Sequence, residues 1–358
     1  MPQRRATNQK NGSRASKRMA ILGCFAVIIL AYFALVGHVL SSRTSVPRRN
    51  GNFPPPPPPP PSSSYQKPSL DDLVQGWNIT GNVSWLMDFS IVGFPKTGTS
   101  SLMFYLEQYT DSIFTFPDER CELGWNQHIK LIRALYRQYQ PHRRMGIKCP
   151  RDLENDLAMS NYNKFFPTTK LIVGLRHPIL WFQSFYNFRV TNEFPMPPAE
   201  RLIGKCVRAN QGVCTYRANF SKHLKLIEPW RKVFVYHVDQ LQETTGGDSS
   251  SGPLFRRDLG AFLSVSRPLD LPMIWVKPGE RSVTFEKQKK IDALKMDICQ
   301  GRYTNLRQVL LTQASQSADW IRNVFLSQPN VVVSNPDRFV KLLDAWHVDP
   351  CTVLNTSA

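Results

Sequence analysis

Apolar and polar residues alternate along the chain in a way that separates two kinds of segment. Short continuous apolar runs are typical of strands buried on both faces of a sheet, and longer segments between them carry apolar residues at helical spacing. Strands are expected at 89–94, 170–175, 232–238 and 330–334, and helices at 100–109, 128–139, 180–190, 220–230 and 258–265. This order predicts an α/β domain with a central parallel sheet flanked by helices.

A different pattern precedes this domain. Residues 19–40 contain no Asp, Glu, Lys or Arg, and about 20 such residues cross the apolar core of a bilayer. Six basic residues lie before the run and only Arg43, Arg48 and Arg49 lie closely after it, so the positive-inside bias places the N-terminus in the cytosol. The run exceeds the apolar core of a signal peptide and no small-x-small cleavage site follows, which favours a signal-anchor over a cleaved signal.

Eight consecutive prolines, Pro54–Pro61, follow the apolar run. Such a segment favours the extended polyproline II conformation and forms no core, so it is expected to be a spacer. An SH3-type ligand is the alternative, but those partners are cytosolic and this segment is expected in a lumen. The sequence therefore predicts a cytosolic tail (1–18), a transmembrane signal-anchor in the lipid bilayer (19–40), a Pro/Ser-rich luminal stem (41–85) and a folded domain (86–358).

The net charge of +18 is unevenly distributed. Ten Lys or Arg residues precede the first acidic residue, Asp71, and without them the chain has 35 basic and 27 acidic residues. The remaining excess of eight positive charges suits anionic ligands. Because no dense basic stripe or nucleic-acid motif is present, we expect no nucleic-acid partner.

The cysteines fit an oxidising compartment. Six of the seven lie beyond the predicted span: Cys121, Cys149, Cys206, Cys214, Cys299 and Cys351. Six cysteines allow 15 pairings, among which Cys206 with Cys214 would close a short loop and Cys299 with Cys351 would tie down the C-terminal region. No C-x-x-C pair suggests zinc. Glycosylation triplets at Asn78, Asn82, Asn219 and Asn355 agree with a secretory lumen.

The most informative segment is FSIVGFPKTGTSSL, a predicted strand, a Gly-containing loop and a helix. Such a unit binds anions, because backbone N–H groups at the helix N-terminus face the ligand and glycines allow its close approach. Gly93 and Gly98 have the spacing of an ATP-binding P-loop, but Thr99 occupies the position of the P-loop lysine and Lys96 lies inside the loop. This departure argues against a nucleoside triphosphatase.

The segment from Phe94 to Leu102 resembles the 5′-phosphosulfate loop of sulfotransferases that use 3′-phosphoadenosine 5′-phosphosulfate (PAPS), of the form x-P-K-[TSG]-G-T-[STR]-[SA]-L. The resemblance implies a P-loop-like sulfotransferase fold. It implies that Lys96 reaches the oxygen that joins sulfate to the 5′-phosphate. The residues that would hold the phosphosulfate are Thr97, Gly98, Thr99, Ser100 and Ser101.

A second segment adds to this resemblance. The family binds the adenosine 3′-phosphate with an Arg at a strand end and a Ser eight residues later on the next helix. In KLIVGLRHPILWFQSFYNFR, Arg176 follows the strand, Pro178 can begin the helix and Ser184 has the required spacing. Arg offers a fork of donors suited to phosphate, and Ser adds a hydroxyl.

Two looser matches follow from the same resemblance. MGIKCPRDL is similar to the K-[ST]-P segment of the heparan-type branch and would place Lys148 in the active site, although Cys149 replaces the usual hydroxyl residue. Cys299-Gln300-Gly301-Arg302 resembles a loop that closes over the nucleotide, which would make Arg302 a phosphate contact. A structural role is the alternative for Lys148.

The reaction also needs a general base for the acceptor hydroxyl, and the glycan branch of the family uses a Glu that follows the second strand. FTFPDERCELGWN offers Glu119 and Glu122. Glu122 fits the family pattern better, and Glu119 remains an alternative. His128 or His177 is the fallback, with His177 expected to be structural.

The resemblance as a whole implies a Golgi membrane protein of the single-pass type II arrangement, with its catalytic domain in the lumen. It would use PAPS as co-substrate, without a metal, to sulfate a hydroxyl of a luminal acceptor, in particular a glycan. A tyrosyl or lipid acceptor and a catalytically inactive protein of the same fold are alternatives. The acceptor, the oligomeric state and the role of residues 311–358 do not follow from the sequence.

Overall fold

A computed structural model of the chain describes residues 67–194, 196–199, 220–243, 251–275 and 285–354. These residues belong to one compact unit that begins at Lys67. The predicted tail, span and proline run lie outside the described residues, as do Cys206, Cys214, Asn219 and Asn355. Within the described ranges, no helix combines the length and the apolar character needed to cross a membrane.

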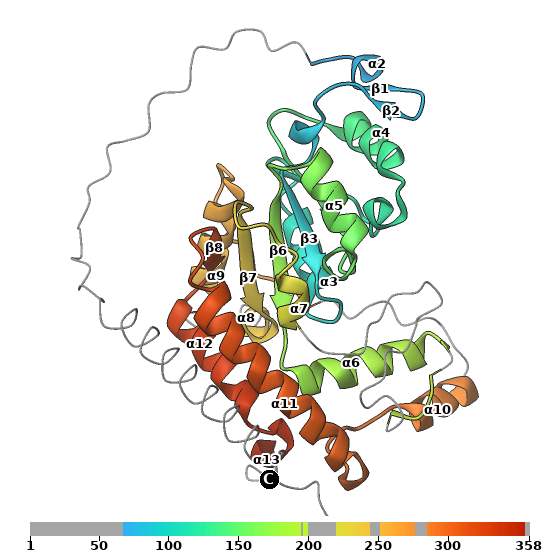
Figure 1. Ribbon diagram of the computed structural model, residues 1–358, viewed down its shortest axis with the longest axis vertical. Helices are drawn as coiled ribbons and strands as arrows, with labels where there is room; N and C mark the ends of the chain where they lie inside the picture. Colours follow the sequence, from blue (N-terminus) through green and yellow to red (C-terminus); the bar gives the residue numbers. More distant parts are fainter. Residues whose placement is uncertain (1–66, 195, 200–219, 244–250, 276–284, 355–358) are drawn as a thin grey trace, which may run out of the picture. The chain divides into compact units, whose positions relative to one another are not determined.

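The centre of the unit is a six-stranded sheet in which all neighbouring strands are parallel (Figure 1). The order across the sheet is β4-β5-β3-β6-β7-β8. The strands are β3 (Phe89–Gly93), β4 (Ile113–Thr115), β5 (Arg144–Lys148), β6 (Lys170–Leu175), β7 (Val233–His237) and β8 (Val331–Val333). After β3 the chain forms β4 and β5 on one side of that strand, and then forms β6, β7 and β8 on its other side. In open parallel sheets ligands bind at such a switch point, beyond the carboxyl ends of the strands.

Helices and single turns fill the connections. Before the sheet lie α2 (Leu70–Leu73), the antiparallel pair β1 (Val74–Gln75) and β2 (Asn78–Ile79), and η1 (Ser84–Leu86). The first half of the sheet is joined by α3 (Thr99–Glu107), η2 (Glu122–Trp125), α4 (His128–Gln138), η3 (Asp152–Glu154), α5 (Asp156–Phe165), α6 (Pro178–Thr191) and α7 (Phe220–Leu224). The remainder contains α8 (Val238–Glu243), α9 (Ser251–Leu263), α10 (Phe285–Leu294), η5 (Gly301–Tyr303), α11 (Thr304–Trp320), η6 (Ile321–Phe325), α12 (Pro336–Asp344), η7 (Ala345–His347) and α13 (Pro350–Leu354).

Successive residues of the central strands point to two separate hydrophobic cores. On one face Val92, Val173 and Val235 pack with residues of α4, α5, α6, α11 and α12. On the other face Ile91 and Ile172 pack with α3, α8 and α9. Burial on both faces explains why these strands read as continuous apolar runs.

The four predicted strands are confirmed as β3, β6, β7 and β8. The pattern missed β4, which has three residues, and β5, which begins with Arg144 and ends with Lys148. The helix expected at 220–230 ends at Leu224. Beyond it the chain turns through i→i+3 bonds, because the N–H of Leu226 donates to His223 O and that of Ile227 to Leu224 O.

Residues 67–85, which composition had assigned to the stem, form part of the compact unit. Lys67 Nζ donates to Tyr136 O at 3.0 Å and lies over the Tyr136 ring, and the Tyr136 hydroxyl donates to Pro68 O. Asn78 and Asn82 are exposed in this segment. The boundary of the folded domain therefore lies nearer to Lys67 than to residue 86.

The C-terminal region is cross-linked, and the suggested Cys299–Cys351 pairing is confirmed. Arg307 of α11 holds the same region from inside. Its guanidinium donates to Asp349 Oδ2 at 2.8 Å, to Ile298 O at 2.7 Å and to Gln300 O at 3.1 Å. The strand expected at 330–334 is β8, and the helices of this region are α11, α12 and α13.

Candidate active site

In the loop between β3 and α3, two residues have a left-handed backbone conformation. Gly98 has φ 82° and precedes α3, and a Cβ there would lie 2.8 Å from Leu241 Cδ1. Lys96 has φ 66°, which is uncommon for a residue with a side chain. The first N–H groups of α3 have no acceptor within the helix, so they form a site for an anion.

The loop is tied to its neighbours by inward bonds. The Thr97 hydroxyl is fully buried and donates to Phe94 O at 2.6 Å. Trp181 Nε1 donates to Pro95 O at 2.7 Å. Any contact of Thr97 with a ligand would therefore use its backbone N–H. Thr99 and Ser101 are also buried, whereas Ser100 is partly exposed.

Lys96 extends from this loop to α6. Its Nζ lies 4.6 Å from the centre of the Phe188 ring. Burial lowers the pKa of Lys96, the nearby Arg176 lowers it further, and Glu119 partly opposes both effects. The ammonium is therefore close to another cation and to a carboxylate.

Arg176 directly follows β6, and its Nη1 donates to Lys96 O at 3.4 Å. Burial lowers the pKa of Arg176, and Asp239 opposes this effect. Ser184 lies in the second turn of α6 and makes no side-chain hydrogen bond within the part of the chain that the structure describes. Phe188 is one helical turn further on. The structure thus places Lys96 and Arg176 together, with α6 beside them.

Lys148 comes to the same place from the end of β5. Its side chain is 7% exposed, and its Nζ donates to Ser100 Oγ at 2.9 Å. Glu119 Oε1, from the loop after β4, lies 3.2 Å from that Nζ. Three strand ends and the first turn of α3 therefore contribute to one cluster of cations with a carboxylate beside it.

The two candidate bases differ in their surroundings. The Glu119 side chain is half exposed, pairs with Lys148 and influences the pKa of Lys96. Glu122 is buried in η2, where its two carboxylate oxygens face the Arg120 guanidinium at 2.6 and 3.3 Å. Glu119 is thus the carboxylate at the cluster, and Glu122 has a partner of its own.

The remaining predicted residues lie elsewhere. Arg302 is exposed and packs over the Tyr303 ring, with no recorded contact to residues 94–98 in the described ranges. His128 stacks on Phe165. His177 caps α6: its Nδ1 accepts from Ile179 N, its Nε2 lies 3.2 Å from Val348 O, and burial lowers its pKa to about 4. Both nitrogens of His177 are engaged, which leaves neither for a proton transfer.

Sequence reasoning missed Arg120 and Phe188. Phe188 lies four residues after Ser184, and this helical spacing is the signal that could have placed it beside Lys96. Arg120 lies between the two candidate carboxylates, and no spacing rule for an irregular loop identifies which of them it would bind.

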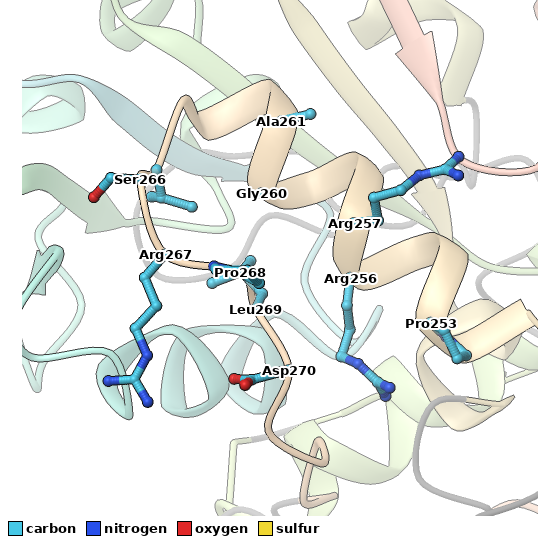
Figure 2. Close-up of a pocket in the computed structure, with 11 residues that line it drawn as sticks. Pro253, Arg256, Arg257, Gly260, Ala261, Ser266, Arg267, Pro268, Leu269 and Asp270 are labelled. Carbon is cyan, nitrogen blue, oxygen red and sulfur yellow. The ribbon is translucent and has the colours of Figure 1, made fainter.

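Two cavities that the described residues form lie away from this cluster. One of about 400 Å³ lies between α9 and the segment after it, where Arg256 and Arg267 extend to the same side with Asp270 between them (Figure 2). The other, of about 610 Å³, lies at the amino ends of β6, β7 and β8. Neither is lined by residues 94–98, so the candidate site is defined by its charges and its position on the sheet.

No protein-family profile matches the chain. A search of curated proteins likewise finds no match. Among solved structures the chain is similar to a sulfotransferase from Alicyclobacillus acidocaldarius, with 18% identity, a TM-score of 0.46, and coverage of 66% of this chain and 96% of that one. A likeness at this level does not establish a family, so the function has to be inferred from the site itself.

Proposed function

We propose that the protein is a sulfotransferase, which transfers the sulfuryl group of PAPS to a hydroxyl of a luminal acceptor, in particular a glycan. The observation that carries this proposal is the meeting of Lys96, Lys148 and Arg176 around the first turn of α3, with Glu119 beside them. A phosphosulfate and a 3′-phosphate together bring several negative charges, which this cluster can neutralise.

Each residue then has a role that its position supports. The acceptor oxygen attacks sulfur as the bond from sulfur to the 5′-phosphate oxygen breaks, and the hydroxyl proton passes to a carboxylate. Glu119 supports this role better than Glu122, because it is half exposed and lies beside Lys148. Lys96 and the N–H groups of α3 stabilise the charge that develops on the leaving bisphosphate.

Arg176 and Ser184 are the proposed ligands of the 3′-phosphate. Arg176 lies at the carboxyl edge of the sheet beside the loop, and the guanidinium fork suits a phosphate. Ser184 has an uncommitted hydroxyl within the described residues. Arg302, which is exposed over the Tyr303 ring, is proposed as a further phosphate contact.

A kinase is disfavoured because Thr99 occupies the position at which a P-loop has its phosphate-binding lysine. A protein of the same fold that binds the nucleotide without turnover remains the second candidate, because it would need the same cations. Release of labelled sulfate from PAPS to an acceptor distinguishes the two.

We also propose a Golgi location with a single span at residues 19–40 and a luminal catalytic domain. The exposed glycosylation triplets at Asn78 and Asn82 support a luminal position, as does the Cys121–Cys149 disulfide. The luminal position is tested by glycosidase treatment of the protein in membranes. The wild type should lose mass on treatment, and the Asn78→Gln and Asn82→Gln variants should each lose less.

The first experiment is calorimetric titration of the full chain in detergent with 3′,5′-adenosine bisphosphate. We expect binding, and we expect Arg176→Ala to weaken it about 10- to 100-fold, because charged hydrogen bonds are lost. Arg307→Ala is the matched control, since it removes an arginine that is bonded within the C-terminal region. Absence of binding by the folded wild type, or equal binding by Arg176→Ala, contradicts the proposal.

A further inference from the structure

The loop that carries Glu119 is fastened to the end of β5 by three successive residues. Glu119 pairs with Lys148 at 3.2 Å, and the N–H of Arg120 donates to Lys148 O at 2.9 Å. Cys121 forms a disulfide with Cys149, and their Cα atoms are 5.1 Å apart. The covalent bond therefore holds the proposed base beside the proposed active-site lysine.

A buried carboxyl group lies against this disulfide. Asp152 is 1% exposed, and a carboxylate oxygen of Asp152 and the two sulfurs all lie within 4.8 Å of one another. Burial raises the pKa of Asp152 to about 8. Asp152 therefore holds a proton at neutral pH, with a carboxyl oxygen within 4.8 Å of both sulfurs.

Some of the groups around Asp152 lower its pKa and others raise it. The Tyr162 hydroxyl of α5 donates to Asp152 Oδ2 at 3.0 Å, which favours the ionised form, as does the neighbouring Arg151. Glu122 and Glu119 disfavour that form through charge repulsion. These groups oppose one another, and burial decides the direction of the shift.

The two sulfurs also differ in access. Cys121 is partly exposed, whereas Cys149 is 1% exposed. An external thiolate therefore reaches Cys121, and the sulfur of Cys149 is the one that leaves.

We propose that Cys121–Cys149 is a thiol-exchange site in which Asp152 gives its proton to the departing sulfur of Cys149, and that opening this bond separates Glu119 from Lys148. The second half rests on the proposed sulfuryl transfer. The disulfide and its acid thus form a redox-sensitive device that positions the proposed catalytic pair.

The exchange is balanced with a small thiol as the reductant. Its thiolate attacks Cys121 Sγ, the bond between the sulfurs breaks, and Cys149 leaves as a thiolate that takes the proton of Asp152. A second thiolate attacks the reductant sulfur of the mixed disulfide, the oxidised dimer of the reductant forms, and Cys121 leaves as a thiolate that takes a proton from the medium. Two thiols supply the two electrons, and the medium returns a proton to Asp152.

The second disulfide is a natural comparison. Cys299 is partly exposed and Cys351 is 3% exposed, so access to the two bonds is similar. Two carboxylates lie beside this bond: Asp349 accepts from the N–H of Cys351 and forms an ion pair with Arg307 at 2.8 Å, and Asp297 accepts from the N–H of Cys299 at 3.1 Å. Within the described residues, neither carboxylate forms a close cluster with both sulfurs of this bond, as Asp152 does at Cys121–Cys149.

The test follows each disulfide separately in the full chain in detergent. The protein is incubated with 2-mercaptoethanol at pH 7, free thiols are trapped with iodoacetamide, and peptides are quantified by mass spectrometry. We expect Cys121–Cys149 to open about tenfold or more faster than Cys299–Cys351, because general acids contribute at least this much. Asp152→Asn should remove the difference.

Glu154→Gln is the matched control. Glu154 lies two residues further on, and burial raises its pKa also to about 8. It does not belong to the cluster of Asp152 and the two sulfurs. Its substitution should leave the opening rate unchanged, whereas an equal loss in both variants would indicate a general disturbance and overturn the role of Asp152.

A second variant keeps the test decisive if Asp152→Asn does not fold. Tyr162→Phe removes the donor that favours ionised Asp152, so the pKa of Asp152 rises further. The opening rate follows the product of thiolate and protonated Asp152, and 2-mercaptoethanol ionises at higher pH than Asp152. In the wild type the rate should therefore rise with pH and level off as Asp152 loses its proton. The pH at which it levels off should be higher in Tyr162→Phe, and an unchanged pH counts against the proposal.

Transfer is measured on the selectively opened protein. We expect turnover to fall about 10- to 100-fold, because a small displacement of a reacting group has this cost. Bisphosphate affinity should change little, since Lys96 and Arg176 follow other strands. Unchanged turnover overturns the coupling, whereas failure of the untreated protein to bind bisphosphate overturns the proposed function and leaves the exchange result standing.

Discussion

Two regions of the protein hold partly buried cationic side chains, and they differ in the partners that these side chains have. In the C-terminal region Arg307 is 11% exposed and has a carboxylate, two carbonyls and the Thr304 hydroxyl as partners. At the carboxyl edge of the sheet, Lys96 and Arg176 have no ion pair within the described residues, and burial lowers the pKa of both. The difference agrees with the proposal that the second region binds an anion, whereas the first has its partners within the chain.

The largest effect should come from removing the charge at the carboxyl edge. Lys96→Met keeps the apolar stem beside Phe188 and should lower turnover about 1000-fold, the scale of losing a group that stabilises developing charge. The melting temperature should not fall, because the cation that is removed is partly buried and has no ion pair within the described residues. A large loss of stability with retained turnover would show that Lys96, like Arg307, has a structural role and not a catalytic one.

The two carboxylates sharpen the comparison within one loop. Glu119→Gln should lower kcat about 100-fold, because the proposed proton acceptor is lost. Glu122→Gln instead leaves Arg120 without its ion partner and should act mainly on stability, by about 1–3 kcal/mol. Steady-state kinetics with thermal unfolding separates these outcomes, and the reverse pattern would return the role of base to Glu122.

The smallest effect on function is expected at Arg307. Arg307→Ala should lower the free energy of unfolding by about 1–3 kcal/mol, because buried acceptors lose their donor. The affinity for bisphosphate should stay within error of the wild type. A changed affinity would mean that the C-terminal region takes part in the nucleotide site.

The sequence predicted the part of the fold that has a strong pattern. β3, β6 and β7 are buried on both faces and read as apolar runs. β5 was missed because its ends are Arg144 and Lys148, and its place in the sheet depends on pairing with β3. β4 is only three residues long, which periodicity cannot detect.

The candidate site likewise has residues that the sequence could place and residues that it could not. Lys96 and Arg176 follow strands within recognisable spacings, so they could be placed together before the structure was known. The choice between Glu119 and Glu122 depends on side-chain directions in an irregular loop, and the family pattern favoured the one that pairs with Arg120. The Cys121–Cys149 bond joins residues 28 apart, and no rule of spacing selects it among the possible pairings.

The two outer strands of the sheet are short, and this affects the tendency of the protein to aggregate at high concentration. β4 and β8 form the two edges of the sheet, and each has three residues. Another chain that added to either edge would gain only a short ladder of backbone bonds, even though Val332 of β8 is 39% exposed. Short edge strands are one way in which proteins avoid edge-to-edge pairing of their sheets and aggregation. Lengthening β8 by apolar residues should therefore lower solubility while activity is still retained.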